Sequence, residues 1–226
     1  MSTYQLYCFA ESGNAYKAAL MLELCGLDWG PVHVRYFDGE TREPRYRETV
    51  NEMGEVPVLV TPTEKLSQSG VILDYLAEVT GQFGGQTTAE KREIWRWLLF
   101  DNHKFTMNYA TLRFQYAVLK TGDTPVTAFL LGRARTAFEI VDRHLERQPF
   151  IMGDRPTIVD FSMVGYHYHD EPPCMDRRKE YPHLMAWVDR IAALPRWKGP
   201  YELMKSALPD VVSAAGTASP RGTRSS

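Results

Sequence analysis

Segments that favour β-strands are confined to the first 80 residues of this chain, and helical patterns fill the rest. In the first part, short runs rich in aromatic and β-branched residues, such as YQLYCF and VPVLVT, alternate with helical patterns. The expected strands are residues 4–9, 32–37, 56–61 and 65–66, and the expected helices are residues 15–24 and 69–78, with a short irregular helix between 38 and 55. Strands that alternate with helices predict an α/β domain with a mixed sheet.

The second part of the chain contains several helical patterns and no strand pattern. A segment rich in Gly and Thr precedes it, and we expect a linker at 81–88 between a domain at 1–80 and one at 89–209. The expected helices are 89–120, one from Pro125 to about 146, two that start at Thr157 and Pro182, and a short one within 197–205. Short connections between helices predict an all-α bundle. Residues 210–226 are dominated by small and polar residues and are expected to form a disordered tail.

Composition argues against several classes of function. Hydrophobic residues are 44% of the 226 residues and charged residues 24%, which is the balance of a globular protein with a buried core. The 26 basic and 28 acidic residues give a net charge of -2, so we expect no nucleic-acid partner. The chain lacks a run of 18 apolar residues and a secretory signal, and three cysteines are too few for a disulfide framework. We therefore expect no membrane partner and a cytoplasmic location.

One segment, YHYHDEPPC at 166–174, carries residue types that bind metals. Histidines two positions apart on a helix do not face the same way, so His167 and His169 would converge only where the helix had unwound. We therefore favour polar residues at a helix end over a zinc site, and predict no metal. The glycine-rich motifs of dinucleotide and P-loop sites and the C-x-x-C redox motif are also missing from the sequence.

Three short motifs in the first part have the chemistry to hold a peptide-like or anionic ligand. A cis bond before Pro57 would turn the backbone N–H and C=O of Val56 outward, although a trans proline at a sheet edge is favoured by spacing alone. Ser69 is expected to cap the helix that follows Gln68, and Ser12 stands where the first helix starts. Helix N-termini favour anions, yet each serine taken singly is better explained as a simple cap.

Five segments in order, YQLYCF, SGNAYK, GEVPVLV, QSGVILDYL and DRPTIVDF, resemble the glutathione transferase superfamily over roughly residues 3–205. The resemblance implies a thioredoxin-like N-terminal domain, an all-helical C-terminal domain and a homodimer. It implies that glutathione binds the first domain as a co-substrate, and that a small hydrophobic electrophile lies between the domains. The implied activity is that of a glutathione transferase, which attacks the electrophile with the glutathione thiolate, and the implied role is detoxification.

The resemblance also implies roles for individual residues in glutathione binding. Val56, before Pro57, would pair with the cysteinyl backbone of glutathione. Gln68 and Ser69 would take the γ-glutamyl amino and carboxylate groups. The loop GETREPRY matches the region that meets the glycine carboxylate, where Arg42 is the expected contact.

For activation of the sulfur, the resemblance points to the turn between the first strand and the first helix. The serine-type theta and zeta classes keep an activating hydroxyl there, and Tyr16-Lys17 matches the pair that follows the zeta-class serine. This match makes Ser12 the first choice and Asn14 the second. Tyr7 and Cys8 invite comparison with other classes, but both lie inside the first strand and are expected to fill the core.

Other matched residues are assigned to structure or leave the reaction open. Thr157 and Asp160 match the family's helix-capping box, which is structural. An aromatic-rich stretch of the first long helix suits a flat apolar electrophile, although bundle core and dimer contacts account for most of its residues: Phe105, Met107, Tyr109, Leu112, Arg113, Phe114 and Tyr116. The alternatives are a glutathione-dependent isomerase, dehalogenase or disulfide reductase, or a non-catalytic binding module. The Ser-Gly-Asn turn lacks the zeta-class Ser-Ser-Cys, which argues against maleylacetoacetate-type isomerisation.

Overall fold

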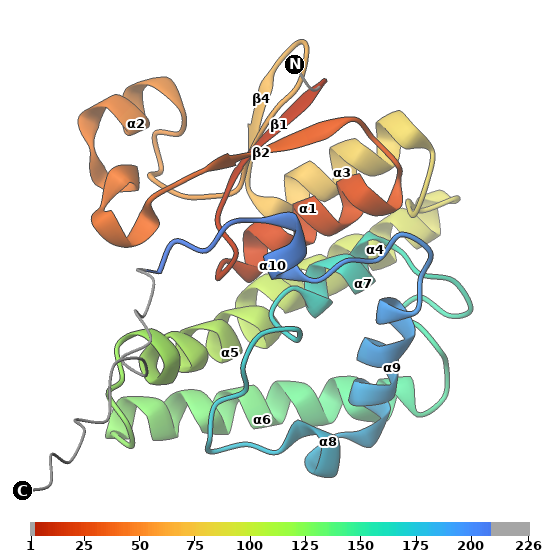
Figure 1. Ribbon diagram of the computed structural model, residues 1–226. Coiled ribbons are helices and arrows are strands. Elements are labelled where there is room, and N and C mark those ends of the chain that lie inside the picture. The colour runs from red at the N-terminus through yellow and green to blue at the C-terminus, as the bar shows by residue number, and fades with distance from the viewer. Residues whose placement is uncertain (1–2, 209–226) are drawn as a thin grey trace, which may run out of the picture.

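The computed structural model describes residues 3–208 and contains a four-stranded sheet followed by a bundle of helices (Figure 1). The strands are β1 (Tyr4–Cys8), β2 (Trp29–His33), β3 (Val58–Val60) and β4 (Lys65–Ser67), in the spatial order β2-β1-β3-β4. β1 and β2 are parallel, and β3 is antiparallel to both β1 and β4. The sheet is therefore mixed, as the sequence predicts. The predicted tail at 210–226 lies outside the described residues.

The second strand is displaced from the expected segment 32–37 and begins at Trp29. Pro31 lies inside this strand opposite Leu6, and β2 forms one edge of the sheet. A proline fits an edge strand because no second neighbour needs its missing N–H. The expected end of the strand forms a 3-10 turn instead, η1 (Tyr36–Asp38).

Within the described residues, the regular elements of the second part of the chain are all helices. Its helices are α4 (Thr88–Phe100), α5 (Thr106–Arg113), α6 (Pro125–Leu145), α7 (Ile158–Val164), α8 (Arg177–Glu180), α9 (Pro182–Ala192) and α10 (Pro200–Leu203). The pattern predicted over 89–120 contains two π-helical segments, η3 (Asp101–Phe105) and η4 (Phe114–Val118), on either side of α5. Segments of this kind are rare and occur often at functional sites.

Helix α1 (Gly13–Leu24) is the element through which the two parts meet. It packs against β1 and against α3 (Ser69–Thr80) on one side, and against α7 and α10 of the helical part on the other (Figure 1). Because it is enclosed in this way, nearly all of its residues are buried. The short α2 (Pro44–Thr49) and the turn η2 (Glu40–Arg42) lie apart from α1 and α3.

The predicted capping box at the start of α7 is confirmed. The backbone N–H of Thr157 donates to Asp160 Oδ2 at 2.8 Å, and the Thr157 hydroxyl donates to the same oxygen at 3.2 Å. Asp160 Oδ1 also accepts from the backbone N–H of Ile151 and from the indole N–H of Trp187, each at 2.9 Å. One buried carboxylate thus ties α7 to α9 and to the loop between α6 and α7.

A buried ion pair joins α1 to the helical part. Lys17 Nζ lies 3.1 Å from Asp101 Oδ2, and both side chains are fully buried. The hydroxyls of Thr106 and Ser162 also donate to the Asp101 carboxylate, the latter at 2.6 Å. A buried charge is tolerated when it is both paired and hydrogen-bonded. The pair therefore fixes how α1 sits against η3, α5 and α7.

These elements define a thioredoxin-like N-terminal domain with a mixed sheet, followed by an all-helical C-terminal domain. The mixed α/β sheet and the helical bundle were predicted from the order of strand and helix patterns, and the thioredoxin-like form of the first domain was implied by the family resemblance. Within residues 3–208, no helix combines the length and the apolar character needed to cross a membrane.

We expect Lys17→Met to lower the free energy of unfolding by about 3–5 kcal/mol, because it leaves the Asp101 carboxylate buried without a cation. Urea unfolding would measure this loss. The double variant Lys17→Met/Asp101→Asn should recover part of it, since the amide is neutral and still accepts hydrogen bonds. The matched control is Arg178→Met, which breaks the exposed pair with Asp189 and should cost less than about 1 kcal/mol. Equal losses in Lys17→Met and the control would contradict the role given to the buried pair.

Candidate active site

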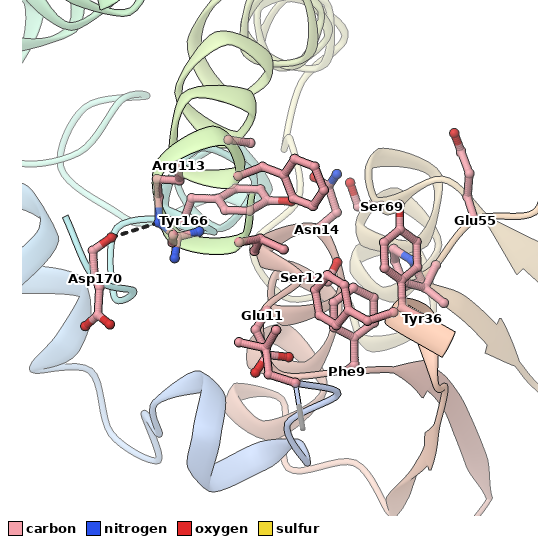
Figure 2. A pocket seen from close by; sticks show the side chains of 18 of the residues that line it. Phe9, Glu11, Ser12, Asn14, Tyr36, Glu55, Ser69, Arg113, Tyr166 and Asp170 are labelled. Atoms are coloured by element: carbon pink, nitrogen blue, oxygen red, sulfur yellow. Dashed lines mark hydrogen bonds between the residues drawn. The ribbon is translucent and has the colours of Figure 1, made fainter. Parts of the chain in front are cut away.

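A cavity of about 430 Å³ lies between the two domains, beside the N-terminus of α1 (Figure 2). Its size is that of a small-molecule site. From the first domain it is lined by Phe9, Glu11, Ser12, Asn14, Tyr36, Phe37, Glu55, Val56, Pro57, Gln68 and Ser69. From the helical domain and the segment after it, the lining residues are Asn102, Ala110, Arg113, Phe114, Ala117, Val118, Tyr166, Asp170, Tyr201 and Leu208. Both domains are therefore needed to form it.

Ser12 caps α1 and faces the cavity. Its Oγ accepts the backbone N–H of Ala15 at 3.2 Å, and only 7% of the residue is exposed. A hydroxyl has one donor and two acceptor positions, so capping leaves the Ser12 O–H free to donate to a ligand. Asn14, in the first turn of the same helix, also lines the cavity. The structure thus brings both candidates for sulfur activation to one place.

The loop before Ser12 is held by the far end of the chain. His169 Nε2 lies 2.8 Å from the backbone oxygen of Ala10, and the Ala10 N–H donates to the backbone oxygen of Lys205 at 2.9 Å. The neighbouring Glu11 carboxylate accepts the hydroxyl of Ser206 and the backbone N–H of Ala207. The turn that carries Ser12 is therefore positioned by segments of the helical domain.

Val56 and Pro57 form another wall of the cavity, and the peptide bond between them is cis. Val56 lies outside the strands, and within the described residues its backbone N–H and C=O have no hydrogen-bond partner. A free N–H and C=O on one residue are the groups that pair with an extended peptide.

Gln68 and Ser69 lie at the N-terminus of α3, but the predicted cap is displaced by one residue. Gln68, not Ser69, occupies the N-cap position, with φ of 70°, and Ser69 is the first helical residue. The side-chain amide of Gln68 donates to Glu55 Oε2 at 3.0 Å instead of capping the helix. A non-glycine residue in this region carries about 1–3 kcal/mol of backbone strain, which is typical of ligand sites. The Ser69 hydroxyl forms no hydrogen bond within residues 3–208 and lines the cavity.

Arg42 is exposed on η2 and does not line the cavity. In the turn η2 the neighbouring Thr41 is buried, with 2% of its surface exposed, and Arg42 faces solvent. The residues from this region that line the cavity are Tyr36 and Phe37, which sequence reasoning missed. Phe9 stacks on Tyr36 with the ring centroids 4.8 Å apart, so this wall is aromatic and suits apolar ligands.

Tyr166 of the helical domain covers the start of α1. A Cβ atom at Gly13 would overlap the Tyr166 ring, so the turn accepts this ring only because residue 13 has no side chain. Burial raises the pKa of the Tyr166 phenol, and the backbone amide of Asn14 and the hydroxyl of Ser12 oppose that rise. The phenol is therefore a neutral hydroxyl beside the helix N-terminus.

The remaining candidates lie elsewhere. Tyr7 of β1 packs edge-on against Tyr46 of α2, and burial raises the pKa of the Cys8 thiol to about 12. Of the aromatic-rich stretch in the first long helix, only Arg113 and Phe114 line the cavity. The others are in the bundle core (Phe105, Tyr109 and Leu112) or are not among the lining residues (Met107 and Tyr116).

The histidines of the YHYHDEPPC segment have separate partners. His167 is stacked between aromatic rings, and its Nδ1 lies 2.9 Å from a guanidinium nitrogen of Arg177. His169 contacts Ala10, as described above. Among residues 3–208, no three His, Cys, Asp or Glu side chains gather in a way that could hold a metal ion.

The sequence matches two family models, described as the N-terminal domain of glutathione S-transferase at residues 2–78 and its C-terminal domain at residues 103–195. Glutathione S-transferase 3 of Zea mays is 30% identical over 212 residues, which cover 88% of this chain and 93% of that protein. The chain belongs to the glutathione S-transferase family.

Other similar proteins carry related names. Disulfide-bond oxidoreductase YghU of Escherichia coli (strain K12) is 24% identical, covering 86% of this chain and 72% of that protein. A glutathione S-transferase structure from Xanthobacter autotrophicus Py2 has a TM-score of 0.80 at 28% identity, covering 88% of this chain and 98% of that one. A homologue from Lodderomyces elongisporus, solved with two glutathione molecules per subunit, has a TM-score of 0.79 at 23% identity, covering 89% and 99%.

We expect the free energy of unfolding to fall as the pH drops from about 6.5 towards 4. Burial lowers the pKa of His169 to about 4 from its usual 6.5, so in this window the unfolded chain binds a proton that the folded chain excludes. Thermal unfolding at pH 7.5, 6 and 5 would measure the effect. His169→Gln should reduce the pH dependence, whereas the control His183→Gln, at an exposed position, should leave it unchanged. Identical pH profiles for His169→Gln and the parent protein would rule out this contribution.

Proposed function

We propose that the protein is a glutathione transferase of the serine type, similar to the theta and zeta classes, in which Ser12 activates the glutathione thiol. The observation that carries the proposal is that the residues predicted for glutathione binding and activation, apart from Arg42, line one cavity between the domains. A cytoplasmic location and a role in detoxification are part of the same proposal.

In the proposed complex, glutathione lies along the first domain. The free backbone groups of Val56 pair with its cysteinyl peptide, and the N-terminus of α3 with Ser69 holds its γ-glutamyl carboxylate. Gln68 and Glu55, which are hydrogen-bonded to each other at 3.0 Å, accept its α-amino group. This arrangement places the cysteine sulfur towards the N-terminus of α1 and Ser12.

The available interactions are large enough to ionise the thiol near neutral pH. A free thiol has a pKa of about 8.5, and lowering it by about two units requires roughly 2.7 kcal/mol in favour of the anion. A hydroxyl hydrogen bond to a charged sulfur supplies about 1.5–3 kcal/mol, and a helix N-terminus adds about 0.3–1 kcal/mol. Ser12 at the start of α1 offers both, and the thiolate then attacks a soft electrophile.

Disulfide exchange is the second candidate, because it begins with the same thiolate and one similar protein is named a disulfide-bond oxidoreductase. Conjugation forms a thioether on carbon, whereas exchange forms a mixed disulfide that a second glutathione resolves. Parallel assays with an aromatic halide and with a low-molecular-weight disulfide separate the two reactions.

We expect Ser12→Ala to lower kcat/KM for an aromatic halide by at least about tenfold, the equivalent of one lost hydrogen bond to an anion. Glutathione should still bind when measured by calorimetry. Ser12→Asp is the matched control for the helix cap, because a carboxylate accepts the Ala15 N–H but cannot donate to a thiolate. It should keep the stability of the parent protein and lose activity. Full activity in Ser12→Ala would move the role to Asn14, to be tested with Asn14→Ala.

We also propose that the protein is a homodimer. Large apolar side chains on α3 and α4 are unusually exposed, with 44% of Val71, 46% of Trp95 and 64% of Leu99 accessible. Trp95 and Leu99 are one helical turn apart and share a face of α4. Their burial against a second copy would remove this apolar surface from water.

We expect Leu99→Glu to convert the dimer to a monomer, because a carboxylate on this face opposes burial. Light scattering of the purified protein would report the mass. The control is Phe129→Glu on α6, where 62% of the side chain is exposed and the dimer should persist. Dissociation by the control alone would show that the proposed face is wrong.

A further inference from the structure

Arg113 is a buried cation with no anionic partner in the described part of the chain. It is the last residue of α5, directly before the π-helical segment η4, and only 8% of it is exposed. Among residues 3–208, no carboxylate lies within 4 Å of its guanidinium nitrogens. Burial accordingly lowers the pKa of Arg113. A buried charge without a counter-ion is costly, so its position calls for an explanation.

One edge of the guanidinium is used to hold the side chain in place. Its Nε donates to the backbone oxygen of Asp170 at 2.9 Å, and its Cζ lies 5.7 Å from the centroid of the Tyr166 ring. The Asp170 carboxylate is exposed and points away from the guanidinium (Figure 2). The two terminal nitrogens have no protein partner in residues 3–208, and Arg113 lines the cavity. They present a fork of donors that matches a carboxylate.

The other charged side chains at the cavity are accounted for. Glu11 is bonded to Ser206 and Ala207, and Glu55 is bonded to Gln68 at the opposite side of the cavity from Arg113 (Figure 2). Arg113 is thus the single cation among the lining residues that the structure describes. An anionic ligand group that enters the helical-domain side of the cavity has one place to bind.

We propose that Arg113 binds a carboxylate carried by the second substrate, so that the enzyme prefers electrophiles or disulfides that carry a carboxylate over their neutral analogues. The inference rests on the proposed function, because it concerns what reacts with glutathione. The Tyr166 ring contacts both sides of this part of the cavity, because it packs on Gly13 and its centroid lies 5.7 Å from Arg113 Cζ.

The probe for reaction with an aromatic halide is 4-chloro-3-nitrobenzoate. The glutathione thiol releases its proton to water, and the sulfur forms a bond to the ring carbon that carries chlorine. Chloride then leaves with the bonding electron pair, and the product is a thioether whose carboxylate stays on Arg113. For 3,3′-dithiodipropionate, the thiolate breaks the S–S bond, and a second glutathione releases the remaining thiol while glutathione disulfide forms.

Direct binding tests the inference without turnover. Calorimetry with S-(4-carboxybenzyl)glutathione and S-(4-carbamoylbenzyl)glutathione compares a carboxylate with a neutral amide of similar shape. The parent protein should bind the carboxylate at least about tenfold more tightly. Arg113→Gln should lose this preference, and Arg113→Lys should keep part of it because the charge remains without the fork. The control Arg133→Gln removes an exposed arginine of α6 and should keep the whole preference.

Turnover is the second measurement, and it shows whether the carboxylate is carried by an electrophile such as an aromatic halide or by a disulfide. Arg113→Gln should lower kcat/KM at least about tenfold for 4-chloro-3-nitrobenzoate and less than about twofold for 4-chloro-3-nitrobenzamide. The corresponding disulfide pair is 3,3′-dithiodipropionate and neutral bis(2-hydroxyethyl) disulfide. The pair on which the parent protein shows both activity and dependence on Arg113 identifies the substrate type.

Two results would overturn the inference while leaving the proposed function intact. The first is equal binding of the two conjugates by a parent protein that binds glutathione. The second is an equal loss on charged and neutral probes in Arg113→Gln, which would make the residue structural. Failure of glutathione itself to bind would instead remove the proposed function and the inference with it.

Discussion

The arrangement of the two domains depends on the buried contact between Lys17 and Asp101. Lys17 is the one charged residue among the buried residues of α1, so its charge requires an acid from the other domain. Ser12, at the N-terminus of the same helix, is five residues away, or about 7.5 Å along the axis. Because one helix carries both residues, the contact that joins the domains also fixes the position of Ser12 relative to the cavity residues of the helical domain.

The two domains contribute different kinds of chemistry to the cavity. The first domain supplies backbone groups, helix N-termini and a hydroxyl, through Val56, Ser69 and Ser12, and these suit a peptide-like thiol. The helical domain supplies a buried guanidinium and a phenol, through Arg113 and Tyr166. Under the proposed function, such a division would let the first domain hold glutathione while the helical domain selects the second substrate.

The residues predicted from sequence are those whose geometry is local. A strand, a turn and a helix start lie within a few residues of Ser12, and Val56-Pro57 lies directly before a strand, so short motifs locate these residues. The predicted helix cap at Ser69 is still displaced by one residue, because Gln68 occupies the N-cap position and turns its side chain to Glu55. Arg42 lies in a loop without a distinctive motif, and the resemblance assigned it to a site that it does not line.

The position of Tyr166 could not be predicted from local motifs. It lies in a segment whose histidines suggested metal chemistry, and its position over Gly13 follows only from domain packing. Asp101 is the exception among these distant contacts, because its spacing from the apolar Ile94 and Leu98 in the sequence puts it on the same side of the long helix, which the structure buries.

The contact between Gly13 and Tyr166 makes two distant positions behave as one. The ring occupies the volume that any side chain at position 13 would need, so a bulkier residue there would have to displace Tyr166. A single methyl group added to the first domain would thereby reshape the part of the cavity that the helical domain lines. The shape of the cavity is therefore set by residues on both sides of the domain boundary.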